Sequence, residues 1–161
     1  MCIRDRYLNF DMLGSPNPGY FTDDGDQSTQ TGQVVPAPDG SAGIERLLAG
    51  RLSLAGVRPA DIPLQRTTDY GPFLAAGIPV GGLTTGSSQP KTEVQARLWG
   101  GKAGVAFDPN YHTRGDTIDN VDPDALGIMA ASAAYAVGTY AQSIEGVNGV
   151  PARDQRDRHT P

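Results

Sequence analysis

The stretch that decides the fold is "DYGPFLAAGIPVGGLTTG", residues 69–86. Its second half, residues 78–86, is an uncharged and mainly apolar run that ends in Gly and Thr, which indicates a buried strand. Its first half, residues 69–77, places a Gly-Pro pair before Phe-Leu-Ala-Ala and predicts a turn followed by a short helix. A short helix that leads into a buried strand is typical of a layered α/β fold.

Upstream of this stretch the sequence predicts two more strands and a helix. Residues 7–20 alternate apolar and polar side chains and then break at glycine and proline, which indicates a strand ending in a turn. Apolar side chains recur with helical spacing from Ser41 until Gly56, and residues 61–68 are expected to form a short strand. The polar segment 22–42 predicts a long surface loop.

Downstream, the strongest helix prediction covers residues 122–146. Asp122 can cap this helix, and Pro123 suits its first position. The predicted buried stripe consists of Leu126, Met129, Ala133, Val137, Tyr140 and Ile144. Residues 87–106 are expected to be a loop with one helical turn.

Length and composition indicate one domain, because 161 residues with 38% apolar content can bury a modest core. Residues 1–6, "MCIRDR", are charged and aperiodic, and we interpret them as a sequence artefact or a truncation scar. The folded portion is expected to span residues 7–146. Residues 147–161 are charged and aperiodic and predict a disordered tail.

The charge pattern excludes several partners. A net charge of -5 without a dense Lys/Arg cluster gives no footprint for nucleic acid. No apolar run approaches the roughly 18 to 20 residues of a membrane span, so no membrane partner is expected. Cys2 is the only cysteine, so an intrachain disulfide or a thiolate cluster cannot form, and a metal site must use His, Asp and Glu.

Two residues are candidate metal ligands. Asp11 lies at the predicted end of a strand, where ligands gather in α/β sheets, although an Asp there also commonly caps its own turn. His112 lies in a loop before the last helix, and neutral imidazole is a good zinc ligand. By itself a loop histidine is more often an ordinary hydrogen-bonding residue than a metal ligand, so both alternatives stay open at this point.

Five more positions have weaker signals. Tyr111 could donate a hydrogen bond to a developing oxyanion. Asp116 is either a helix-entry cap or a partner of a metal ligand, and Asp69 is most simply a turn-capping residue. Gly81 and Gly82 would let the backbone approach a ligand closely, but glycine at a strand end is a weak signal.

Four segments together resemble the C-terminal half of the secreted bacterial double-zinc aminopeptidases, metallopeptidase family twenty-eight. They are "YLNFDMLGSPNPGYF", "TDYGPFLAAGIPVGGLTTG", "KTEVQARLWGGKAGVAFDPNYHTRGDT" and "NVDPDALGIMAASAAYAV", in the family's order. The resemblance implies a three-layer α/β sandwich of the zinc-exopeptidase type with a mixed central sheet. In this chain it is expected as an incomplete C-terminal portion.

By matching motif, the resemblance implies roles for the candidate residues. Asp11 would be a ligand of one zinc, His112 a ligand of the other, and Tyr111 the tyrosine that steadies the tetrahedral intermediate. Asp69 would support the site.

The same resemblance points to a pocket for the N-terminal side chain. Gly81, Gly82 and Leu83 are expected to border it. Thr84 stands where some relatives have an aromatic residue, so the side-chain preference stays open.

The implied activity is zinc-dependent hydrolysis of the first peptide bond of peptides with a free N-terminus. The complete enzyme would use two zinc ions and would be a secreted monomer, whereas no motif supports calcium. One alternative keeps the fold but changes the reaction to glutaminyl cyclisation. Another is a non-catalytic domain that has lost its metals.

We predict that the 161-residue chain by itself neither retains zinc stoichiometrically nor hydrolyses peptides. The family's other ligands, a His, a bridging Asp and a Glu, and its general-base Glu all precede the matched region. About three protein ligands are needed for each zinc, and this chain offers one matched ligand for each. Equilibrium dialysis and a leucine p-nitroanilide assay check this, and one tightly held zinc per chain with turnover would contradict it.

Overall fold

The structure, a computed structural model, describes residues 5–29, 35–144 and 146–156. Its strands are β1 (Tyr7–Phe10), β2 (Phe21–Asp24), β3 (Ala60–Pro63) and β4 (Val80–Thr84). Its α-helices are α1 (Ser41–Leu54), α2 (Gly71–Ala75), α3 (Glu93–Trp99) and α4 (Pro123–Gln142). Short 3-10 helices cover Ile118–Asn120, Gly146–Asn148 and Arg153–Gln155.

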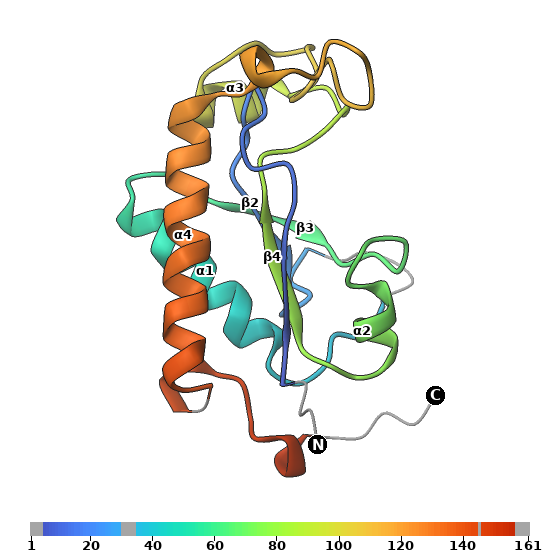
Figure 1. Cartoon of the computed structure of the whole chain (residues 1–161), viewed down its shortest axis with the longest axis vertical. Coiled ribbons are helices and arrows are strands. Elements are labelled where there is room, and N and C mark those ends of the chain that lie inside the picture. The colour runs from blue at the N-terminus through green and yellow to red at the C-terminus, as the bar shows by residue number, and fades with distance from the viewer. Residues whose placement is uncertain (1–4, 30–34, 145, 157–161) are drawn as a thin grey trace.

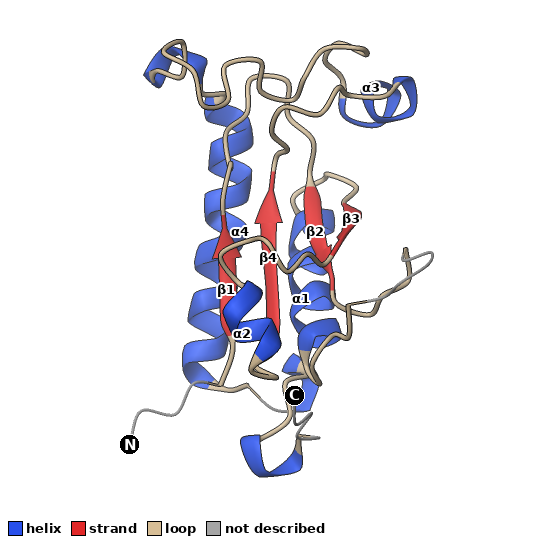
Figure 2. Ribbon diagram, turned by 90° about the vertical axis from the view of Figure 1, so that its right-hand side faces the viewer, coloured by secondary structure: helices blue, strands red, loops and turns tan. Residues whose placement is uncertain are grey.

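The four strands form one mixed sheet in the order β1-β4-β2-β3. β1 runs parallel to β4, and β2 runs parallel to β3 but antiparallel to β4. The carboxyl ends of β1 and β4 therefore meet at one end of the sheet, and β2 ends at the opposite end. Figure 2 shows the sheet face on, with β1 and β4 side by side. This confirms the predicted α/β class with a mixed sheet.

Helices α1 and α4 together cover one face of the sheet, and the short helix α2 lies on the other (Figures 1 and 2). The main core joins α1, α4 and β4 through Ile44, Leu48, Met129 and Leu83. A smaller core lies beneath α2, formed by Leu64, Tyr70, Leu74 and Val80. Above α2 the second face of the sheet is left open, and the pocket described below lies there. Among the described residues, no helix is long and apolar enough to cross a membrane.

Strand β2 lies inside the segment for which a surface loop was predicted, so that prediction is wrong for residues 22–24. All four residues of the strand are buried, including Thr22, Asp23 and Asp24. The Thr22 hydroxyl donates to the Asp61 carboxylate at 2.6 Å, and the Asp24 carboxylate accepts from the Ser28 amide at 2.9 Å. Because partners elsewhere satisfy these buried polar groups, no apolar alternation marks the strand.

The buried stripe of α4 is displaced by about one residue from the predicted one. Its fully or nearly buried members are Ala125, Met129, Ser132, Ala136 and Tyr140. Leu126 is 40% exposed and Val137 is 53% exposed, although both were expected in the core. Small side chains face α1 and the sheet, because they allow closer packing than the larger apolar residues beside them.

The disorder predicted from residue 147 onward does not extend over residues 146–156. Val150 is completely buried in the main core, and the Asn148 carbonyl accepts a hydrogen bond from the Tyr140 hydroxyl. Burial of the Val150 side chain holds this segment against the main core, although the charged composition of the segment predicted disorder. Residues 1–4 and 157–161 lie outside the described residues. The interpretation of residues 1–6 as non-native therefore stays a prediction.

The close contact of β4 with α1 generates a test of packing. A Cβ at Gly81 would lie 2.5 Å from the Ile44 side chain, whereas a Cβ at Gly50, on the exposed side of α1, would meet nothing within 4 Å. We expect Gly81→Ala to lower the free energy of unfolding by about 1–3 kcal/mol through overpacking. Gly50→Ala should raise it by about 0.5–1 kcal/mol, because glycine is a poor helix former. Urea denaturation followed by circular dichroism measures both, and equal effects would contradict this account.

Candidate functional site

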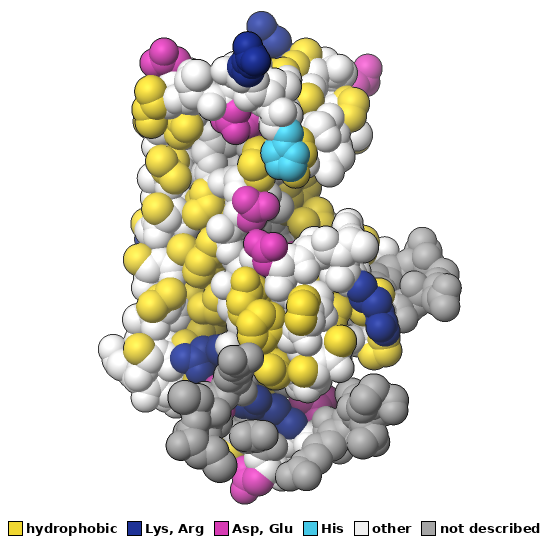
Figure 3. All heavy atoms as spheres, turned by 45° about the vertical axis from the view of Figure 1, so that its right-hand side comes forward, with side chains coloured by type: hydrophobic (Ala, Val, Ile, Leu, Met, Phe, Trp, Pro, Cys, Tyr) yellow, Lys and Arg dark blue, Asp and Glu magenta, His cyan; other side chains and the backbone are white. Residues whose placement is uncertain are grey.

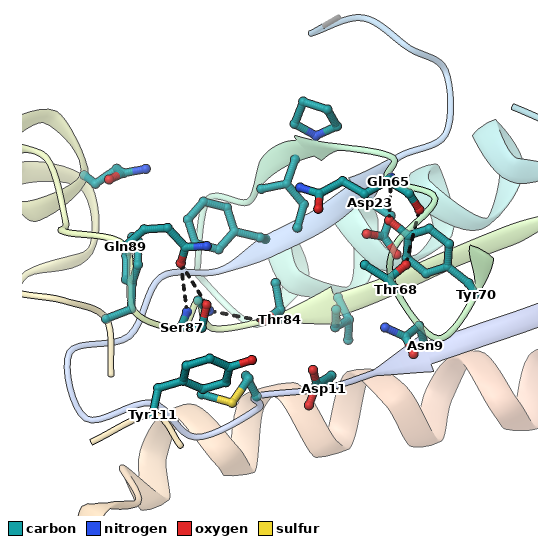
Figure 4. A pocket seen from close by; sticks show the side chains of 18 of the residues that line it. Asn9, Asp11, Asp23, Gln65, Thr68, Tyr70, Thr84, Ser87, Gln89 and Tyr111 are labelled. Carbon is teal, nitrogen blue, oxygen red and sulfur yellow. Dashed lines mark hydrogen bonds between the residues drawn. The ribbon is translucent and has the colours of Figure 1, made fainter. Parts of the chain in front are cut away.

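A pocket of about 510 Å³ opens on the face of the sheet that α1 and α4 leave uncovered. It lies at the carboxyl ends of β1 and β4, the place where α/β sheets generally bind ligands. Figure 4 shows its side chains. Its polar lining consists of Asn9, Asp11, Asp23, Gln65, Thr68, Tyr70, Thr84, Ser87, Gln89, Thr92, Gln95 and Tyr111.

Asp11 follows β1 directly and lines this pocket with an exposed side chain. The next residue, Met12, has a left-handed backbone with φ of 55°. Its carbonyl accepts from the Thr85 amide at 2.7 Å and also from the Thr85 hydroxyl. A left-handed methionine is energetically costly, so these bonds from the residue that follows β4 hold the turn that exposes the Asp11 carboxylate.

Tyr111 lines the same pocket, and the ring of His112 is stacked on it with centroids 3.9 Å apart and an interplanar angle of 18°. His112 is exposed and has a left-handed φ of 57°. In Figure 3 the histidine lies beside a hollow of the surface, with acidic side chains below it on the same face. The structure thus brings Asp11 and Tyr111 to one pocket and sets His112 against the ring of Tyr111.

A network of buried and partly buried polar side chains supports the Tyr111–His112 loop. Asp108 is 4% exposed, and its carboxylate accepts from the Asn110 amide at 2.8 Å and from the Asn120 side chain at 3.0 Å. The Asn110 side chain donates to the Asn120 side chain at 2.6 Å. Neither Asp108 nor Asn120 was predicted as a site residue, although the Asp-Pro-Asn turn indicates that an Asp side chain there binds nearby amides.

Two predicted residues lie away from the pocket lining. Asp69 is exposed, although its neighbours Thr68 and Tyr70 both line the pocket. Asp116 is exposed as well, and its carboxylate accepts from the Asn120 side chain at a long 3.5 Å. Asp116 therefore contacts the network that supports the loop.

The three residues predicted to border the pocket are distributed over both faces of β4. Leu83 borders the pocket, but its side chain is buried in the main core beneath α1 and α4, on the same face as Gly81. Gly82 lies beneath the pocket, because a Cβ there would be 2.8 Å from the Asp23 carboxylate. Gly81 faces Ile44 of α1 on the opposite side of the sheet. The alternation of side chains along a strand explains this division.

Asp23 is a pocket residue that sequence analysis did not single out. Its carboxyl group is only 6% exposed, and burial raises its pKa to about 7, although a hydrogen bond with the Tyr70 side chain opposes this shift. The Tyr70 hydroxyl also accepts from the Gln65 amide at 3.0 Å. The sequence did not indicate Asp23 as a site residue, because the segment that forms β2 was predicted to be a polar surface loop.

Only one group of three potential metal ligands occurs within residues 5–29, 35–144 and 146–156: Asp24, Asp26 and Glu45. Because β2 runs antiparallel to β4, Asp24 lies at the end of the sheet opposite Asp11. Asp24 is already engaged by the Ser28 and Thr29 amides. This acidic group is therefore separate from the pocket.

A layered α/β architecture with a polar pocket at the carboxyl ends of its strands defines the general class of this protein. Comparison defines the particular family: the chain belongs to peptidase family M28, whose model matches residues 5–137. Peptidases of this family are in general metal-dependent.

Several aminopeptidases are similar to the chain. A probable lipoprotein aminopeptidase, LpqL, of Mycobacterium tuberculosis is 54% identical over 95% of the chain. Leucine aminopeptidase 2 of Arthroderma otae is 41% identical over 94% of it, and the probable leucine aminopeptidase 2 of Aspergillus fumigatus is 43% identical over 88%. The chain spans 31%, 30% and 28% of the length of these three relatives.

The loop geometry predicts that a disulfide can replace the polar support of the Tyr111–His112 loop. A Cβ at Gly115 would lie 2.9 Å from the Asn110 Cγ atom, close to the distance that separates a Cβ from the far sulfur of a disulfide. We expect the Asn110→Cys, Gly115→Cys double variant, made with Cys2→Ser, to form this bond on oxidation. Closing so short a loop should stabilise the oxidised form by about 2 kcal/mol.

Thermal unfolding of the oxidised and reduced double variant measures the effect. The single Asn110→Cys variant is the control, since it loses the hydrogen bond to Asn120 without gaining a disulfide. Free thiols that persist after oxidation would contradict the geometry of the loop.

Proposed function

We propose that the protein to which this chain belongs is a zinc-dependent aminopeptidase that hydrolyses the N-terminal peptide bond of peptides with a free N-terminus. The observation that carries the proposal is the arrangement of Asp11 and Tyr111 around one pocket, with His112 stacked on Tyr111. Membership of the peptidase family supports it, as do the relatives named aminopeptidases.

The chemistry of the donors fits zinc, although the set on this chain is partial. Carboxylate and imidazole are zinc ligands, and the exposed side chains of Asp11 and His112 are accessible to an ion. No third His, Cys, Asp or Glu joins these two in a compact group within the described residues. We infer that Asp11 and His112 each contribute one ligand to one of two ions, and that the other ligands and the general base lie outside this chain.

Bound zinc would supply Lewis-acid polarisation of the scissile carbonyl and a water of lowered pKa. The residues of this chain would orient the substrate and stabilise the charge that develops on its carbonyl oxygen. The Tyr111 hydroxyl would donate a hydrogen bond to the oxygen that becomes negatively charged, and Thr84, with the backbone of Leu83, would contact the N-terminal side chain. Asp69 and Asp116, which do not line the pocket, would act only through neighbouring residues such as Tyr70 and Asn120.

Two alternative functions use the same fold. Glutaminyl cyclisation would use the pocket for an N-terminal glutamine, and a full-length assay with a glutaminyl peptide against leucine p-nitroanilide separates the two. A non-catalytic binding domain would have no need for Asp11, Tyr111 and His112 together. We infer an extracytoplasmic location and a monomeric state, the first supported by the relative named a lipoprotein.

The function is tested in the full-length protein by substitution of Tyr111 and His112. Tyr111→Phe should lower kcat by about 100-fold to 1000-fold, because it removes one oxyanion donor, while the zinc content is unchanged. His112→Ala should lower both the zinc content and the activity, and a chelator should abolish the activity of the parent enzyme.

Tyr135→Phe is the matched control, because Tyr135 is half exposed on α4 and does not line the pocket. Steady-state kinetics and metal analysis of the purified variants give the result. Full activity of the His112→Ala variant would overturn the proposal.

A further inference from the structure

The carboxyl group of Asp23 lies at a different end of the pocket from Tyr111 (Figure 4). The register of β2 with β4 pairs Thr22 with Leu83, so Asp23 is opposite Gly82, which in turn pairs with Asn9. A Cβ at Gly82 would lie 2.8 Å from Asp23 Oδ2. The glycine therefore leaves the space over the sheet that this carboxyl group occupies.

No basic side chain of the pocket balances its acidic ones. Its lining contains two acidic residues, Asp11 and Asp23, and no Lys, Arg or His. The Tyr70 side chain forms a hydrogen bond with Asp23, but burial still raises the pKa of this carboxyl group to about 7. A buried carboxylate is costly unless a positive charge accompanies it, so the pocket favours a ligand that brings one.

We propose that Asp23 determines substrate specificity by binding the positively charged end of an N-terminal lysine or arginine side chain. The inference rests on the proposed aminopeptidase function, which assigns the scissile bond to the end of the pocket near Asp11 and Tyr111. From there the substrate side chain extends along the sheet toward Asp23.

The lining between the two ends suits a long side chain with a charged tip. Ile62 and Phe21, which both line the pocket, offer apolar contact for the methylene groups of a lysine or arginine side chain, which is charged only at its tip. Thr84 narrows the pocket less than an aromatic side chain would at that position. A leucine side chain brings no positive charge to Asp23.

The decisive comparison uses two substrates that differ only in charge at the tip. Lysine p-nitroanilide and norleucine p-nitroanilide share the same four-carbon chain, and only lysine carries the terminal amine. In the full-length enzyme we expect kcat/KM for the lysine substrate to exceed that for norleucine by about tenfold or more. Asp23→Asn should lower the lysine value by roughly tenfold to a hundredfold, and the norleucine value should change by less than about threefold.

Asp61→Asn is the matched control. Asp61 belongs to the neighbouring strand β3 and accepts from the Thr22 hydroxyl, which an asparagine can also do, and it does not line the pocket. The Asp61→Asn substitution removes one negative charge close to Asp23. It should leave the ratio of kcat/KM for the lysine and norleucine substrates unchanged. Circular dichroism melts check that the variants fold, and Asp23→Ser replaces Asp23→Asn should the latter be unfolded.

Three outcomes separate the two proposals. Equal kcat/KM for lysine and norleucine, or a parallel loss of both in Asp23→Asn, overturns the role of Asp23 while the aminopeptidase function stands. Absence of hydrolysis of any aminoacyl p-nitroanilide by the zinc-loaded protein overturns the function. Calorimetric binding of lysinamide and norleucinamide then tests Asp23 independently, and equal affinities would overturn its role.

Discussion

The pairing of β4 with both β1 and β2 is the interaction on which the rest of the structure depends. The parallel pairing with β1 brings Asp11 beside the end of β4, where the Thr85 amide and hydroxyl hold the turn at Met12. The antiparallel pairing with β2 places Asp23 over Gly82. Two carboxylates that are far from β4 in the chain thereby reach one pocket, because a single central strand has two hydrogen-bonding edges.

Buried polar side chains hold the loops around the pocket. Lys91 is 1% exposed, and its amine donates to the Pro18 carbonyl at 2.9 Å and to the Gly100 carbonyl at 2.8 Å. The Asn17 side chain donates to the Lys102 carbonyl and accepts from its amide. Such bonds fix the geometry of irregular backbone, because each unsatisfied buried group would cost free energy. The Asp108 network does the same for the loop that carries Tyr111.

One face of the sheet packs into the main core, and the other face carries the candidate functional site. The face under α1 and α4 holds the main core, and there Gly81 allows Ile44 to approach the strand. The other face has a small core under α2 and a polar pocket beside it. Successive residues of β4 therefore have different roles. The absence of a Cβ at Gly81 makes room for Ile44, and its absence at Gly82 makes room for the Asp23 carboxyl group. The chain belongs to peptidase family M28, and the open face of its sheet carries the candidate metal ligand Asp11 and the candidate catalytic residue Tyr111.

The sequence by itself determined the α/β class, the α4 helix from its Asp122-Pro123 start, and the strand at 78–86, because each depends on local periodicity or on a local cap. It also singled out Asp11, Tyr111 and His112 through motifs. Only the tertiary structure decided that β2 is a strand, that Val150 is buried and that Asp23 lies in the pocket. The physical reason is that these residues are buried by partners distant in sequence. Their polar or isolated character leaves no periodic signal before those partners are in place.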